Sequence, residues 1–145
     1  AWIEKRLKGQ LHRFQLTDVW KSGGISEPME YGVLTNEIYK AWSGMKASEY
    51  KDYKGIRKES LRDNMSDLEI LLTDIGETAT RELAKKYNPR GLIQNKEIAK
   101  RGGNIAKNTR DNLEKELGRS VITKENNINR RYIESNENIK QIDTN

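Results

Sequence analysis

Residues 66–89 read SDLEILLTDIGETATRELAKKYNP, and this segment decides the fold class. Ser66 followed by Glu69 is a capping-box pattern, in which each side chain accepts a hydrogen bond from a free backbone N–H group at the other residue. Apolar residues then recur every three or four positions and form one stripe: Leu68, Leu71, Leu72, Ile75, Ala79 and Leu83. The pattern predicts a long amphipathic helix, closed by Pro89 and Gly91, that packs through this stripe.

A second long helix is predicted over residues 94–117, with Gly118 at its end. One side of it carries Ile98, Gly102, Ile105, Ala106, Thr109, Leu113 and Leu117. Its middle holds four small residues, Ala99, Gly102, Gly103 and Ala106. Each glycine inside a helix costs about 1 kcal/mol relative to alanine, so another backbone is expected to approach closely and offset this cost. That backbone belongs either to the same chain or to the same helix of a second copy, in which case the four residues mediate oligomerisation.

The N-terminal segment predicts a further helix over residues 2–14. Its apolar residues share one helical face: Ile3, Leu7, Leu11 and Phe14. A short turn is expected to follow and to stop at Gly23 and Gly24. Residues 25–31 contain Pro28 and are expected to form a loop.

Cap residues mark three shorter helices. Thr35 is predicted to cap a helix over residues 36–43, with Gly44 as its left-handed C-terminal residue. Ser48 is predicted to cap a short helix that Gly55 ends. Thr123 is predicted to begin a last, weaker helix.

Composition supports an all-α fold. The chain has 145 residues, of which 34% are hydrophobic and 34% are charged, with two prolines, three valines and one phenylalanine. These numbers predict one compact bundle of five or six helices with a long central helix. We expect a helical domain over residues 1–122, and a weaker C-terminal helix or extended tail over residues 123–145.

Several classes of protein are excluded or disfavoured. No run approaches the roughly 18 apolar residues of a membrane-spanning helix. The chain has no cysteine, so it has no disulfides, and it shows no signal peptide, which together favour a cytoplasmic location. Its single histidine, His12, and its scattered carboxylates give no metal-ligand or catalytic pattern. We therefore expect a protein that is not an enzyme and holds no metal or cofactor.

Basic residues give the clearest functional signal. Residues 89–131 contain eleven Lys or Arg against five Asp or Glu. On the second long helix, Lys96, Lys100 and Lys107, with Arg110 at the edge, lie opposite the apolar stripe. Such a ridge suits the phosphates of nucleic acid. The alternative is an ordinary solvated face, since Asp111 and Glu114 interrupt the ridge.

A second basic group follows Tyr50 and Tyr53 and consists of Lys54, Arg57, Lys58 and Arg62, of which the last three are predicted to assist binding. Basic residues beside aromatic residues suit single-stranded nucleic acid, although tyrosines at this spacing also suit a core. The two basic groups together are the predicted nucleic-acid-binding residues.

Seven segments resemble the DNA-damage-inducible protein D family. They are ISEPMEY at 25–31, LTNEIYKAWSGM at 34–45, EYK at 49–51, ESLRDNMS at 59–66, KRGG at 100–103, AKNTR at 106–110 and LGRSVI at 117–122. The resemblance runs from about Leu16 to Asn127. In that family a BRO-like domain of the prophage-antirepressor type precedes this region, so the resemblance implies that the chain is a C-terminal part.

The resemblance implies a non-catalytic bacterial protein of the DNA-damage (SOS) response or of prophage regulation. Its partner would be DNA, bound in a salt-sensitive manner without sequence specificity, or a DNA-bound protein such as the recombinase RecA. The alternative is an oligomerisation arm of a longer antirepressor-like protein that makes no DNA contact itself. A homodimer is compatible with either hypothesis.

Overall fold

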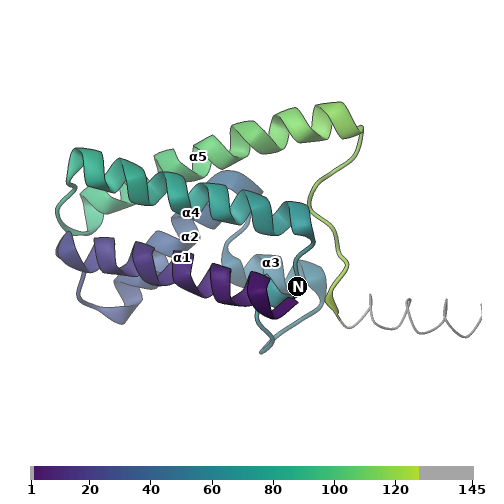
Figure 1. Ribbon diagram of the computed structural model, residues 1–145, viewed down its shortest axis with the longest axis horizontal. Helices are drawn as coiled ribbons and strands as arrows, with labels where there is room; N and C mark the ends of the chain where they lie inside the picture. The colour runs from purple at the N-terminus through teal and green to yellow at the C-terminus, as the bar shows by residue number, and fades with distance from the viewer. Residues whose placement is uncertain (1, 128–145) are drawn as a thin grey trace, which may run out of the picture.

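The computed structural model describes residues 2–127 as an all-α bundle, which confirms the predicted fold class (Figure 1). Its helices are α1 (Trp2–Ser22), α2 (Pro28–Ser43), α3 (Ala47–Lys54), α4 (Asp67–Tyr87) and α5 (Gly91–Leu117), and a 3₁₀ turn, η1 (Arg62–Asn64), precedes α4. Figure 1 shows α4 between α1 and α5, while α2 packs against α5 and α4. The long helix α5 thus has two packing partners and one face turned away from the bundle.

Several helix ends lie where the cap residues predicted them. The Ser66–Glu69 capping box is present, with the Ser66 N–H donating to Glu69 Oε1 at 3.0 Å. Gly44, Gly55 and Gly118 end their helices in the left-handed conformation, with φ of 81°, 72° and 69°. These predictions are confirmed because each depends on local backbone geometry.

Other predicted boundaries were wrong. Helix α1 is continuous through residue 22, without a break before Val19. Helix α2 begins at Pro28, because proline fits the first helical position and Glu30 accepts a hydrogen bond from the Glu27 N–H. Thr35 therefore lies within α2, where its hydroxyl donates to the Tyr31 carbonyl at 2.8 Å.

Three further boundaries differ by a few residues. Helix α3 begins one residue before Ser48, with Lys46 at its N-cap. Helix α4 ends at Tyr87 and is capped by Asn88, which adopts the left-handed conformation with φ of 48°, and α5 begins at Gly91 instead of 94. The helix predicted to begin at Thr123 does not begin there, because residues 123–126 are not helical, and the rest of the predicted helix lies outside the described residues.

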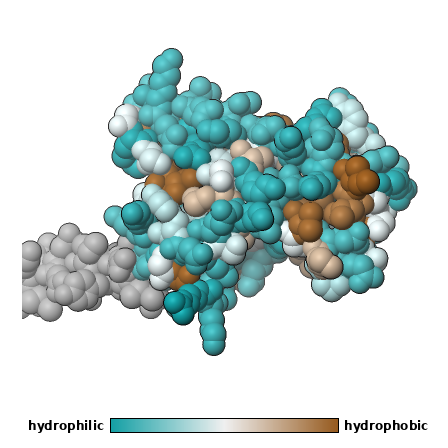
Figure 2. Space-filling model, turned by 180° about the vertical axis from the view of Figure 1, so that it is seen from behind, coloured by the Kyte–Doolittle hydropathy of each residue, from teal (hydrophilic) through white to brown (hydrophobic). Residues whose placement is uncertain are grey.

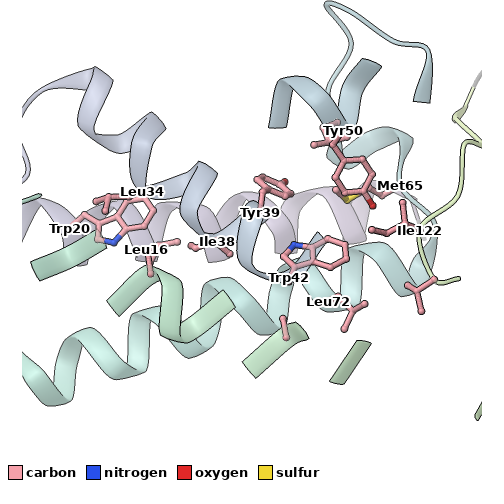
Figure 3. Close-up of a cluster of buried hydrophobic side chains, with 14 of the residues drawn as sticks. Leu16, Trp20, Leu34, Ile38, Tyr39, Trp42, Tyr50, Met65, Leu72 and Ile122 are labelled. Atoms are coloured by element: carbon pink, nitrogen blue, oxygen red, sulfur yellow. The ribbon is translucent and has the colours of Figure 1, made fainter. Parts of the chain in front are cut away.

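Helix α2 contributes more residues to the core than any other helix, and the C-terminal half of α1 adds Leu16 and Trp20 (Figure 3). Leu16 and Trp20 meet Leu34 at one end, and Trp42 meets Tyr50 at the other, with ring centroids 5.9 Å apart. These five side chains have no exposed surface. Three aromatic residues therefore supply much of the apolar area that a chain with a low apolar fraction has to bury.

The predicted apolar stripe of α4 is not its buried face. Leu72 is fully buried, but Leu71 is 47% exposed. The buried residues are mostly polar or small: Glu69, Leu72, Thr73, Gly76, Glu77, Thr80 and Ala84. Gly76 and Thr80 face α5 at short range, whereas Glu69 faces Lys54 of α3 and Glu77 faces Arg13 of α1. The buried hydroxyls of Thr73 and Thr80 donate to carbonyls one turn earlier, at 2.9 and 2.7 Å.

The four small residues of α5 pack within this one chain. Ala99, Gly102, Gly103 and Ala106 are all buried. A Cβ atom on Gly102 would lie 2.7 Å from the Thr80 backbone nitrogen in α4, and one on Gly103 would lie 2.9 Å from the Ile38 carbonyl oxygen in α2. The predicted close backbone approach is thus found between α5 and both neighbours, which leaves none of these residues at the surface for a second copy.

The predicted apolar stripe of α1 is present and faces outward. Its residues are 57–70% exposed: Ile3, Leu7, Leu11 and Phe14. The opposite side of α1 is buried through Gly9, Leu16 and Trp20. Gly9 faces the bundle because the Arg62 guanidinium packs directly on its backbone, leaving no room for a side chain.

Within residues 2–127, no helix combines the length and apolarity needed to cross a membrane.

Candidate nucleic-acid interface

Lys96 and Lys100, both predicted as phosphate-binding residues, lie exposed on the outer face of α5. Lys100 forms no ion pair with any described residue, so its charge is not neutralised within the fold. Lys107 lies farther along the same face, where its ammonium pairs with Asp111 at 2.6 Å. The ridge is therefore strongest in the N-terminal half of α5.

Helix α2 extends this ridge with a cation that the sequence analysis did not single out. Glu37 of α2 accepts from Lys40 at 3.2 Å and lies 3.7 Å from the Lys96 ammonium. The carboxylate thus links two cations on neighbouring helices. Because the side chain of Glu37 is only 12% exposed whereas the two lysines are about half exposed, the surface here is cationic.

Helix α4 adds a second extension on the other side of α5. The Arg101 guanidinium lies 4.9 Å from the centroid of the Tyr87 ring, and the Lys86 ammonium lies 5.1 Å from it. The Arg101 hydrogen bond and the neighbouring Lys86 charge lower the pKa of Tyr87 below its ordinary value. The sequence signal was present in the adjacent pairs Lys86-Tyr87 and Lys100-Arg101, but only the α4–α5 packing brings them together.

These residues form one surface, which we call the α5 basic band: Lys40, Lys96, Lys100, Arg101 and Lys86. It crosses α5 from α2 to α4 within about two turns of helix. Glu37 and Glu97 are the carboxylates nearest to it along α2 and α5. Several separate ammonium and guanidinium groups on an open surface are suited to contact successive phosphates.

The first turns of α2 and α5 each expose a large apolar side chain. Figure 2 shows the face behind α1, which is largely hydrophilic, with apolar side chains gathered at one end. Met29 and Ile93, in the first turns of α2 and α5, are 78% and 86% exposed. The surface around the band is thus not uniformly polar.

Arg110 lies at the predicted ridge but is used inside the fold. Its Nη1 donates to the Trp42 and Ser43 carbonyls, at 3.2 and 3.1 Å, and its Nε donates to Glu114 at 3.0 Å. These carbonyls belong to the last turn of α2, where acceptors have no helical partner and a positive charge is favourable. We therefore assign Arg110 to helix capping and leave it out of the α5 basic band.

The second predicted group does not join the band. Arg57 and Lys58 are exposed in the loop after α3, whereas Arg62 pairs with Asp74 at 2.6 Å and packs on α1. Helix α4 separates α1 from α5 (Figure 1). Tyr50 is buried and donates to Glu69, so it is not available for base stacking.

An open pocket of about 310 Å³ lies between α1, α2, α3, α4 and residues 60–62. Arg13, Tyr39, Arg62 and Glu77 are among its lining residues. Burial raises the pKa of Glu77, while the nearby Arg13 and Arg62 charges lower it to a smaller extent. Arg13 Nη1 lies 3.6 Å from Glu77, and Arg13 also donates to Thr35. These bonds tie three helices together.

Among residues 2–127, no group of His, Cys, Asp and Glu side chains is arranged to hold a metal ion. Comparison of the chain with protein-family models, with curated proteins and with solved structures finds no match in any of the three. The function is therefore inferred from the side chains and their geometry.

Proposed function

We propose that this helical bundle is a non-catalytic module that binds DNA through the α5 basic band. The observation that carries the proposal is the placement of Lys100 and Arg101 at the centre of a cationic surface that three helices build. The residue patterns resembling the DNA-damage-inducible protein D family support a role in the DNA-damage response or in prophage regulation. The contacts would be made mainly to phosphates, because the band offers charges and no set of side chains shaped to read base edges.

The interaction is expected to depend strongly on salt. Each phosphate neutralised by the band releases condensed counterions, and the logarithm of the binding constant falls with the logarithm of salt concentration by about 0.9 per contact on duplex DNA. For single-stranded DNA the corresponding fall is about 0.7 for each phosphate contact. Titrating the full chain with labelled single- and double-stranded DNA at several salt concentrations measures the number of contacts on each.

A charge-matched pair of variants tests the location. Lys96→Gln/Lys100→Gln/Arg101→Gln removes three charges from the band, and Lys8→Gln/Lys21→Gln/Lys46→Gln removes three exposed charges from α1 and the α2–α3 connection. In the first variant, the slope of the logarithm of the binding constant against the logarithm of salt concentration is expected to fall in magnitude by about two to three. The second variant is expected to keep most of the wild-type slope. Equal losses in the two variants would show that only net charge matters, and would overturn the band as the site.

A further inference from the structure

Tyr87, the last residue of α4, is the most exposed tyrosine among residues 2–127. It is 48% exposed, whereas Tyr39 and Tyr50 are buried and Tyr53 is 40% exposed. Phosphate binding by the α5 basic band uses the cations around Tyr87 and leaves its ring without a role. An exposed aromatic ring is a flat surface on which another flat group can stack.

Two cations from different helices flank this ring. The Arg101 guanidinium of α5 lies 4.9 Å from the ring centroid, and the Lys86 ammonium of α4 lies 5.1 Å from it. Neither cation forms an ion pair with a residue that the structure describes. With both cations in place, Tyr87 still keeps nearly half of its surface exposed. The open part of the ring therefore borders charges that are free to meet phosphates.

An aromatic ring among unneutralised cations suits single-stranded DNA. In a duplex, the faces of each base are covered by the neighbouring bases, so an outside ring has nothing to stack on. An unpaired strand exposes these faces, and its phosphates can contact cations while a base stacks on the ring. Stacking accepts any base, because every base has a π-face, and it therefore needs no side chains that read base edges.

We infer that the α5 basic band binds single-stranded DNA in preference to duplex DNA, with one unpaired base stacked on the Tyr87 ring between Arg101 and Lys86. The inference rests on the proposed function, because the band supplies the phosphate contacts on either side of the stacked base. From Arg101 the strand continues over Lys100 toward Lys96. Charge contacts alone would give no such preference, since duplex DNA has the steeper dependence on salt for each contact.

Tyr53 provides a matched control within the same chain. It is 40% exposed, and the Lys124 ammonium lies 5.5 Å from the centroid of its ring. It belongs to α3, which lies toward the end of the bundle opposite to the α4–α5 connection (Figure 1). Tyr53→Leu thus removes a comparable ring beside a lysine and leaves the α5 basic band intact.

The experiment titrates the full chain with three labelled ligands of equal length: oligothymidylate, an abasic oligonucleotide and a duplex. Wild type is expected to bind oligothymidylate at least about five times more tightly than the abasic strand, because one stacked base contributes this much. It is also expected to bind oligothymidylate more tightly than the duplex. These comparisons need no substitution, so they hold even if a variant is unstable.

Tyr87→Leu is expected to weaken binding of oligothymidylate by at least about fivefold and to leave binding of the abasic strand and the duplex unchanged. The slope of the logarithm of the binding constant against the logarithm of salt concentration, here the salt slope, is expected to stay as in wild type, because no charge is removed. Tyr87→Phe keeps the ring and is expected to bind as wild type does. Tyr53→Leu is expected to have no effect.

Three results would overturn the inference. An equal loss on the abasic strand in Tyr87→Leu would mean that the ring only holds its neighbouring cations in place. Tighter binding of the duplex, or an unchanged affinity of Tyr87→Leu for oligothymidylate, would reject the stacked base while the band remained the DNA site. Absence of salt-dependent binding to all three ligands would reject the proposed function together with the inference.

Discussion

The Lys54 ammonium donates to Glu69 Oε1 at 2.9 Å, and neither side chain has any exposed surface. The pair joins the end of α3 to the start of α4. Lys54 also donates to the two carbonyls of the C-terminal segment, and Glu69 accepts from the Tyr50 hydroxyl. Because every ammonium proton has an acceptor, the buried charge is compensated and three parts of the chain are fastened at one point.

Replacing one member of this pair is expected to destabilise the fold strongly. Lys54→Met leaves Glu69 buried without its counter-charge, which costs about 3–5 kcal/mol of unfolding free energy. Lys96→Met breaks a half-exposed pair with Glu37 and is expected to cost less than about 1 kcal/mol. Urea unfolding of both variants measures the difference, and equal losses would contradict the assigned role of the buried pair.

The close contact of α5 with its neighbours predicts an unusual response to alanine. Gly102→Ala places a methyl group against the Thr80 backbone in α4, and overpacking of this kind costs about 1–3 kcal/mol. Gly32→Ala, within α2, meets no atom within 4 Å and is expected to stabilise by about 0.5–1 kcal/mol, because alanine favours helix. Thermal unfolding should therefore move in opposite directions for the two variants. A stabilised Gly102→Ala would show that the helices are not packed this closely.

Arg110 and Lys100 are predicted to have separable effects. Arg110→Gln removes hydrogen bonds to the last carbonyls of α2 and is expected to cost about 1–3 kcal/mol of stability, with the salt dependence of DNA binding unchanged. Lys100→Gln is expected to leave stability nearly unchanged and to lower the salt slope by about one. Urea unfolding and DNA titration of both variants test whether the effects on stability and on binding are separate. An equal change of the salt slope in Arg110→Gln and Lys100→Gln would contradict the prediction.

Glu77 predicts a pH dependence of stability. Burial raises its pKa in the folded state, so between the unfolded and folded pKa values the native protein holds more protons than the unfolded chain. Its contribution is therefore fully present below the unfolded pKa, whose ordinary value is 4.5, and is lost as the pH rises through the folded pKa. Glu77→Gln keeps a neutral side chain at every pH. Its stability relative to wild type is expected to rise with pH above 4.5, as measured by urea unfolding across the range. Parallel stability curves would contradict the raised pKa.

Much of the helical framework could be predicted from the sequence. Ser66 and Glu69, Gly44, Gly55 and Gly118 mark helix ends correctly, because capping depends on residues a few positions apart. Pro28 was misjudged as a loop residue, since a proline is equally compatible with a loop and with the first turn of a helix. The exposure of Lys96 and Lys100 also follows from helical periodicity, which places both about 160° around the helix from the buried Ile98.

Only the tertiary structure decided which faces meet. The stripes of α1 and α4 are local patterns. The approach of α5 through Gly102 determines that α4 buries Thr80, and the partners Lys54 of α3 and Arg13 of α1 determine that it buries Glu69 and Glu77. The same packing turns Arg110 toward the end of α2 and brings Tyr87 beneath Arg101. Periodicity along a chain sets where a side chain points on its own helix. Whether that direction leads to solvent, to a counter-charge or to another backbone depends on residues distant in sequence.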